Sequence, residues 1–472
     1  MIGELNKVEP ASGYVWFISS VAALGGLLFG YDWVVIGGAK PFYEAYFQLT
    51  SPSLQGWAMS CALIGCLVGS LFSGVLSERF GRKPSLLVAA LTFMVSSLGT
   101  GFAAGFPAFV VWRMAGGLAI GLASSLSPMY IAEVAPAEIR GKLVCLNELT
   151  IVIGLLMAQV TNWRIALGAW NVPQFLTSQG LMQWNAKIMQ WNVDVGWRWM
   201  YGATAVPAAV FLLGMMLVPE SPRWLAMRGR AGAARAVLER IGGATHAEFV
   251  LQEIEATHAH PESELRQLMQ PRLRRILLLG VALAVLQQWC GINVIFNYAQ
   301  DIFSAAGYPL SDILFNIVVT GIVMVLFTFL AIATIDRYGR RPLMLLGSGG
   351  LGCIYLVLGA LFHRHSRGLP MLALVVAALA CYAMTLAPVT WVVLSEIFPG
   401  PVRGTAMAIA TGALWIACFV LTYTFPLLNH AVGTAGTFWI YAGICGLGFL
   451  FIRLRLPETR HKTLEEIEDS WD

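Results

Sequence analysis

The chain has 472 residues, of which 57% are apolar and only 12% are charged, and its mean hydropathy is +0.70. Soluble domains carry roughly twice this charged fraction. The composition therefore excludes an ordinary water-soluble fold and indicates that lipid surrounds most of the chain. No basic run is interleaved with aromatic residues, which argues against nucleic-acid binding.

Twelve segments are predicted to cross a membrane, because a spanning helix needs about 20 mostly apolar residues. The first lies near 14–36, is too long for a cleaved signal peptide and is expected to be retained. Five more lie near 55–76, 84–104, 107–131, 142–162 and 198–218. The other six lie near 273–303, 312–335, 342–362, 371–397, 403–428 and 434–456. We predict an all-α membrane protein with twelve transmembrane helices.

The charged residues predict the orientation of these helices. Most of the 30 Lys and Arg residues lie on the same alternate connections and near the two chain ends. The positive-inside rule therefore places both termini in the cytoplasm.

One long polar stretch, 219–272, divides the chain. Its Ala-rich, charged sequence is typical of short amphipathic helices on the cytoplasmic face. We therefore divide the chain into an N-terminal half (1–218), this linker, a C-terminal half (273–456) and a cytoplasmic tail (457–472).

The sequence contains no pattern typical of a metal site or a hydrolase. The eight cysteines lie in apolar segments without a CxxC pair, and no His/Cys cluster has ligand spacing. No serine lies in a Gly-x-Ser-x-Gly motif. We expect a transporter without metal or cofactor, and not an enzyme.

Three charged motifs occur in the first half and recur in the same order in the second. The first-half residues are Glu78, Arg79 and Arg82, then Glu133 and Arg140, then Glu220 and Arg223. The second-half residues are Asp336, Arg337 and Arg340, then Glu396 and Arg403, then Glu458. This repeat predicts a duplicated six-helix unit, an architecture used for alternating access.

Each acid of these motifs can pair with an Arg across neighbouring cytoplasmic helix ends. We predict that such pairs latch the two halves together when the inner side is closed. The alternative is that the basic residues only orient the chain in the membrane.

These motifs, together with Gln287–Asn293 (Gln-Gln-Trp-Cys-Gly-Ile-Asn) in the seventh segment, resemble the sugar porter family of the major facilitator superfamily. The resemblance covers almost the whole chain, and bacterial sugar–proton symporters are the most similar members. It implies two six-helix halves with cytoplasmic helices between them, and proton-coupled symport of a hexose or pentose. It also implies a bacterial inner-membrane location and a monomer, with a monosaccharide, protons and lipid as partners.

Two ionisable residues inside the predicted spans are candidates for proton coupling. Asp32 lies about 27 Å along the first helix, and Arg113 about 9 Å below the outer end of the fourth, at 1.5 Å per residue, so the two can meet at similar depth. An acid that loses its Arg partner in an apolar site takes up a proton. The alternative is a static ion pair.

Glu148 is a third intramembrane acid, at a position where the resemblance implies a sugar-binding Gln. An ionised carboxylate accepts hydrogen bonds from hydroxyls but donates none. It suits sugar binding, a cationic substrate such as an amino sugar, or a second proton site. The alternative is an acid that extends toward nearby basic residues at the membrane surface.

The seventh segment supplies amides suited to sugar hydroxyls: Gln287, Gln288 and Asn293. Gln287 and Asn293 share a helix face only if the helix is broken between them, and Gly291 permits a break. The alternative role is hydrogen bonding between helices. The resemblance also implies sugar contacts by Phe29, Asn297, Tyr298, Trp391 and Trp415, and a hinge at Pro388, although both Trp residues can serve in packing.

Several positions depart from the sugar porter pattern: Met324, Ala387, Leu414 and Cys418 stand where other residues, mostly amides, are common. The sugar is therefore left open. An uncoupled uniporter, a symporter of a polyol or amino sugar, and a transporter-like sensor are the alternatives. Asp32 favours coupling, and the short tail disfavours a sensor.

Overall fold

The computed structural model describes residues 13–136, 139–167, 186–257, 268, 270–308, 310–366, 368–398 and 402–458. Within these ranges the chain is almost entirely helical, as predicted. The side chains of Asp336 and Arg403 and most of the predicted tail lie outside the described residues.

The first half contains six spans. The first five are single helices: α1 (Gly13–Tyr46), α2 (Pro52–Phe80), α3 (Arg82–Gly101), α4 (Phe106–Val134) and α5 (Arg140–Ala166). The sixth span is assembled from a π-helical turn η1 (Asn192–Gly196), α7 (Trp197–Ala203) and α8 (Ala205–Leu217).

The second half is interrupted more often. Its seventh span consists of α12 (Pro271–Trp289), α13 (Ile292–Asn297) and α14 (Ala299–Ala305). Next come α15 (Leu310–Tyr338), α16 (Arg340–His363), and the tenth span α17 (Leu369–Met384) with α18 (Leu386–Ile397). The last helix, α19 (Arg403–Arg455), contains a non-helical Gly433 at φ 70° and so comprises two spans.

Eleven apolar helical segments among the described residues are long enough to cross a membrane, and the last of them has 51 residues. Because Gly433 divides that segment, the predicted twelve spans are present. The first helix is longer than its apolar segment: α1 continues to Tyr46, whereas the predicted span ended at 36.

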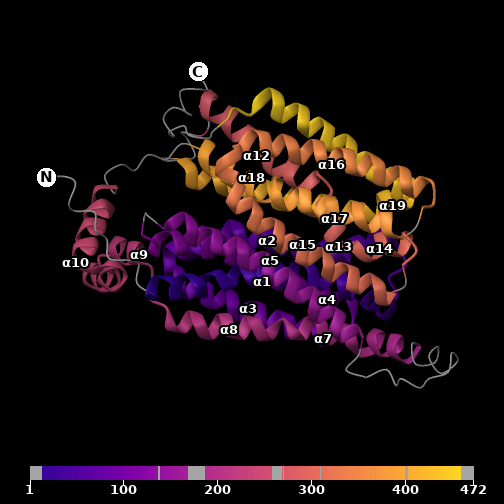
Figure 1. The fold of residues 1–472 in the computed structure, drawn as a ribbon. Helices are drawn as coiled ribbons and strands as arrows, with labels where there is room; N and C mark the ends of the chain where they lie inside the picture. The colour runs from indigo at the N-terminus through magenta and orange to yellow at the C-terminus, as the bar shows by residue number, and fades with distance from the viewer. Residues whose placement is uncertain are drawn as a thin grey trace.

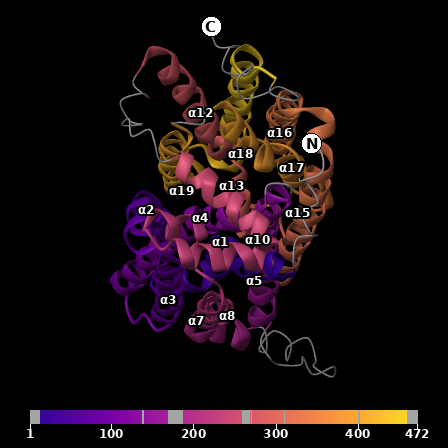
Figure 2. The same cartoon turned by 90° about the vertical axis from the view of Figure 1, so that its left-hand side faces the viewer.

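The helices of each half form one layer (Figure 1), with α1–α8 on one side and α12–α19 on the other. The layers meet where α2 packs on α19, α5 on α15 and α1 on α13. The linker forms α9 (Pro222–Met227) and α10 (Ala231–Thr257), and α10 lies across one end of the bundle (Figure 2).

An apolar exposed face on α8 shows how these helices meet lipid. Val206, Val210, Leu213 and Leu217 follow one another at intervals of three or four residues and are each more than half exposed. In water such a stripe would be costly. In a bilayer it needs no protein partner, since backbone groups are already paired within the helix.

Close helix contacts inside a half depend on glycine. Gly65 and Gly69 of α2 face α4, and Gly117 and Gly121 of α4 face α2. A Cβ atom at any of the four would overlap backbone of the opposite helix. Small residues spaced four apart let spanning helices approach closely, which holds α4, and thus Arg113, in place.

Candidate functional site

A buried ion pair joins α1 to α4. Arg113 Nη1 donates to Asp32 Oδ1 at 2.6 Å, and both side chains are less than one-tenth exposed. The guanidinium also lies over the Tyr201 ring, 5.3 Å from its centroid. The pairing predicted from helix depth is therefore confirmed, whereas its part in coupling stays a prediction.

A small cavity adjoins this ion pair. Its volume is about 20 Å³, which holds roughly one water molecule. Asp32 and Arg113 line it together with Trp33 and Cys66 from the same half and Asn297 from the other. Asn297 Oδ1 is buried without a protein partner among the described residues. The C-terminal half thus presents a free acceptor beside the ion pair.

The seventh span is broken at Gly291, the residue at which the sequence permits a break. Gly291 adopts φ 85°, a left-handed conformation that glycine takes without strain. Gln287 Nε2 donates to the Leu386 carbonyl at 3.3 Å, and Gln288 Nε2 donates to Gln287 Oε1 at 3.4 Å. Asn293 Nδ2 donates in turn to Gln288 Oε1. The break therefore brings the three predicted amides into one hydrogen-bonded chain.

Aromatic rings from both halves meet beside Asp32. Phe29 and Trp33 of α1 lie 5.7 Å and 6.2 Å, centroid to centroid, from Trp415 of α19. Trp415 Nε1 is buried and has no protein acceptor among the described residues. Trp33 was missed by the sequence analysis, although its place next to Asp32 was a usable signal. The cluster offers an apolar ring face and one free donor.

Glu148 is half-buried on α5, the helix that packs on α15 of the opposite half. Its contact with a substrate stays a prediction. Of the remaining predicted contact residues, Trp391 is half-buried on α18, and Tyr298 is fully buried with its hydroxyl donating to the Thr422 carbonyl at 2.8 Å.

The tenth span breaks at Thr385, where φ is −124° and ψ is −90°. Pro388 lies three residues further on, and a proline ring collides with the carbonyl four residues before it. The tenth span is therefore broken between α17 and α18 close to Pro388, whereas the hinge itself stays a prediction.

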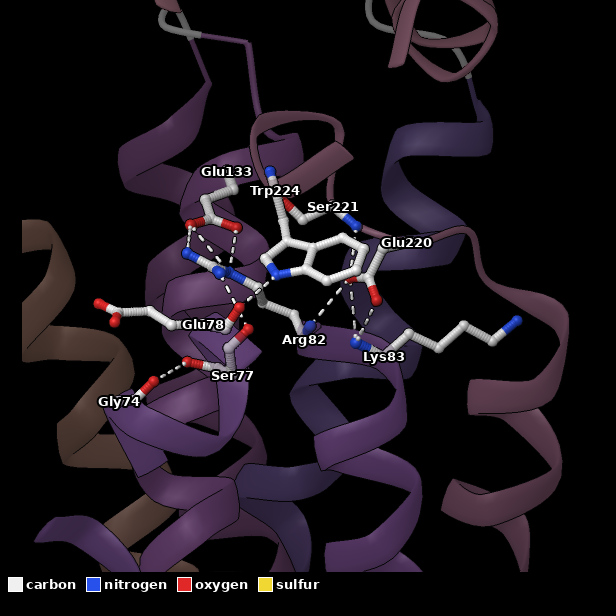
Figure 3. A network of polar contacts seen from close by, with 9 residues as sticks. All are labelled: Gly74, Ser77, Glu78, Arg82, Lys83, Glu133, Glu220, Ser221 and Trp224. Carbon is white, nitrogen blue, oxygen red and sulfur yellow. Dashed lines mark hydrogen bonds and ion pairs between the residues drawn. The ribbon is translucent and has the colours of Figure 1, made fainter. Parts of the chain in front are cut away.

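The first-half motif residues assemble into one network (Figure 3). Arg82 donates through Nε and Nη2 to both oxygens of Glu133, at 2.8–3.2 Å. Glu220 accepts from the backbone N–H of Arg82 and Lys83, so it caps the positive N-terminus of α3. Burial raises the pKa of Glu220. Gly81, at φ 105°, makes the turn that lets Glu220 approach.

The second half repeats this network. Arg340 donates to both oxygens of Glu396, at 2.8–3.2 Å. Glu458 accepts from the backbone N–H of Arg340 at 3.0 Å and of Arg341 at 3.1 Å. Gly339, at φ 88°, corresponds to Gly81. Two equivalent sets of charges thus hold equivalent helix ends.

Both networks connect helices of the same half. The bonds given above for Arg82, Glu133 and Glu220 join helix ends of the first half, and those given for Arg340 and Glu458 join helix ends of the second. The prediction that these residues latch one half to the other therefore stays a prediction. The remaining motif residues belong to the same connections or to the helix ends beside them: Glu78, Arg79, Arg140, Arg223 and Arg337.

A second charged cluster was missed by the sequence analysis. Lys40 Nζ of α1 lies 2.9 Å from Asp301 Oδ2 of α14 and 3.3 Å from Glu44 Oε2. It occupies the end of the bundle away from the motif networks and borders a cavity of about 570 Å³. Asp301 lay inside a predicted span, which was a usable signal.

Two helical halves of major facilitator type, with a buried ion pair inside the first half and a hydrogen-bonded amide chain in the second, define a membrane transporter. The chain matches the family described as "Sugar (and other) transporter" over residues 18–471, and it belongs to that family. It is 37% identical to the D-xylose-proton symporter of Escherichia coli K12, over 98% of this chain and 96% of that one.

Two further similarities agree. The chain is 37% identical to the arabinose-proton symporter of Bacillus subtilis, with 97% of this chain and 95% of that one covered. The inward-open structure of the xylose transporter XylE from E. coli superposes with a TM-score of 0.81 at 36% identity. That superposition covers 97% of this chain and 100% of XylE.

Proposed function

We propose that the protein carries a monosaccharide together with a proton across the bacterial inner membrane by alternating access. The buried Asp32–Arg113 ion pair beside a water-sized cavity is the observation that carries this proposal. The names of the two relatives, which describe a xylose–proton and an arabinose–proton symporter, support a pentose or hexose as the sugar.

The ion pair supports coupling through its burial. An ionised Asp32 is held by Arg113, and neither charge can leave its partner in a dry site without a large cost. A proton on Asp32 removes that attraction and frees Arg113. Movement between the two conformations then depends on whether Asp32 holds a proton.

The sugar site is proposed between the halves. The amides of Gln287, Gln288 and Asn293 supply donors and acceptors for hydroxyl groups, and the Phe29–Trp33–Trp415 cluster supplies a face for ring C–H groups. Asn297 and Trp415 hold unpartnered polar atoms beside this region. Trp391 and Tyr298 complete the proposed set of contact residues.

The orientation and organisation are part of the proposal. The motif networks, rich in Arg and Lys, lie at the cytoplasmic end, so both termini are cytoplasmic. The halves are assigned to 1–218 and 273–456, joined by the linker 219–272 and followed by the tail 457–472. We propose a monomer that performs transport and no enzymatic reaction.

Glu148 favours a second candidate within the same class. A half-buried carboxylate on a helix that packs against the other half suits a substrate with an amino group, since charge-assisted hydrogen bonds are the stronger kind. A polyol or amino sugar would then replace the neutral monosaccharide.

Reconstitution in liposomes tests both candidates. An inward proton gradient is applied, a panel of pentoses, hexoses, inositols and amino sugars is added, and the lumenal pH is followed. Symport predicts acidification with one class of sugar, and none in Asp32→Asn. Sugar uptake without any proton movement would instead indicate a uniporter.

A further inference from the structure

The outer end of the bundle carries a cluster of three charges that the proposed mechanism does not use. Lys40 lies on α1, two turns beyond Asp32, and its side chain is only 7% exposed. Its ammonium donates to both oxygens of Asp301, at 3.0 and 2.9 Å. Lys40 and Asp301 stand 261 positions apart and belong to different halves.

Because Lys40 is buried, its positive charge needs compensation by the neighbouring carboxylates. Its ammonium lies 5.5 Å from the centroid of the Tyr298 ring, and Tyr298 is itself fully buried. Taking an ammonium out of water is costly unless it is paired. One partner, Glu44, lies on the same helix, whereas the other lies on α14. Of the two bonds that Lys40 makes in this cluster, the one to Asp301 therefore ties one half to the other.

The helix that carries Asp301 is preceded by two interruptions of the backbone. Gly291 begins α13 in a left-handed conformation, and Tyr298 separates α13 from α14 with φ −120° and ψ 22°. The seven-residue α14 thus follows two breaks in the seventh span. On the other side, a Cβ atom at Gly37 would lie 3.0 Å from the Asn297 carbonyl oxygen, so α13 packs directly on α1.

The cluster also borders the cavity of about 570 Å³. Lys40, Glu44 and Asp301 line it together with Gln55 from the first half and His430 from the second. Because Lys40 lies on α1 and Asp301 on α14, a separation of these two helices beside the cavity breaks the bond between them.

We propose that Lys40 and Asp301 form an ion-pair lock that holds the outer entrance closed. Glu44 keeps Lys40 compensated when the lock opens, because it moves with the same helix. This inference rests on the proposed function, because a lock of this kind acts in a transporter that alternates between two states. It assigns Lys40 and Asp301 as positioning residues that set the balance between the inward- and outward-facing states.

A distance measurement between spin labels tests the lock without any substrate. Labels are placed at Thr50 and His430, which are exposed and line the cavity from opposite halves. Cys145, Cys353 and Cys381 are first replaced by alanine so that no other accessible thiol reacts. The labelled protein is compared with Asp301→Asn, Lys40→Gln, Lys40→Arg and the matched control Glu44→Gln.

We expect one short distance in the parent protein and in Lys40→Arg. Asp301→Asn and Lys40→Gln should add a population at longer distance, with the open-to-closed ratio raised about tenfold or more. Glu44→Gln also removes one carboxylate but no bond between the halves, so the outer end should stay closed in this variant. An unchanged distance in Asp301→Asn, or equal opening in Glu44→Gln, would overturn the lock.

The result is independent of the proposed function. If no sugar is transported but Asp301→Asn still opens the outer end, the lock stands and the substrate assignment is wrong. If sugar–proton symport is observed and the distances do not change, the symport proposal stands and the lock is rejected.

Discussion

In the interior of the first half, Arg113 Nη1 of α4 lies 2.6 Å from Asp32 Oδ1 of α1, although the two residues are 81 positions apart in the chain. The second half reaches the same place through Asn297, which lines the cavity beside them. Charge on one half and a free acceptor on the other thus share one small volume. The ion pair therefore borders the interface between the halves.

The first prediction concerns Asp32→Asn. The amide cannot bind and release a proton, so accumulation of sugar against its gradient should be lost, whereas exchange of labelled for unlabelled sugar should continue. Uptake and counterflow in proteoliposomes measure the two activities. Arg113 loses its anionic partner in this variant, so Asp32→Asn/Arg113→Gln serves as a control without an unpaired buried charge. Proton-driven accumulation by Asp32→Asn would contradict the coupling role.

Glu148→Gln should change substrate preference. If the carboxylate contacts substrate, its removal weakens binding of an amino sugar relative to the neutral parent sugar by about tenfold, or about 1.4 kcal/mol. Competition with transport of the neutral sugar measures the ratio. Glu78→Gln removes an acid whose side chain is exposed at a helix end and should leave the ratio unchanged. An equal effect in both variants would exclude a contact at Glu148.

Arg82→Gln should destabilise the protein far more than Arg235→Gln. Arg82 pairs with Glu133 where the side chains are 8% and 10% exposed, whereas the Arg235–Glu239 pair is 54% and 43% exposed. Loss of the first leaves a poorly solvated carboxylate and costs about 2–4 kcal/mol. Loss of the exposed Arg235–Glu239 pair should lower the free energy of unfolding by about 0.5 kcal/mol or less. Thermal unfolding in detergent compares them, and similar losses would refute the argument.

Gly81→Ala should lower the unfolding temperature. Its φ of 105° is unfavourable for a residue with a Cβ, at a cost of about 1–2 kcal/mol, and the new methyl would overlap the Glu220 carboxylate. Gly74→Ala on the same helix meets open space and should not lower it. Gly339→Ala should behave like Gly81→Ala, because Glu458 occupies the equivalent place. A loss confined to one half would show that the repeated networks are not equivalent.

The fold followed closely from the amino-acid sequence. Apolar segments predicted the spans, and the repeated motifs predicted two equivalent halves. The Asp32–Arg113 pair followed from helix depth, since rise per residue converts position into height. Gly291 was recognised as a residue that permits a break between Gln287 and Asn293, and the structure shows that the helix is broken there.

Other features were not accessible in this way. The first predicted span ended before Lys40, because a hydropathy window falls at the first charged residues even where the helix continues. The arrangement of the cytoplasmic charges was also open: acids and arginines at matching positions fit pairing within a half as well as between halves. The structure shows the described bonds within each half.

The sequence by itself determined which segments are apolar and long enough to span a membrane, and that three charged motifs recur in the second half, because both can be read directly along the chain. Only the tertiary structure decided that Lys40 meets Asp301, that Trp33 joins Trp415 and that Asn297 lies beside Asp32. Such contacts depend on how helices distant in the chain rotate and pack against one another, and no local pattern encodes that rotation.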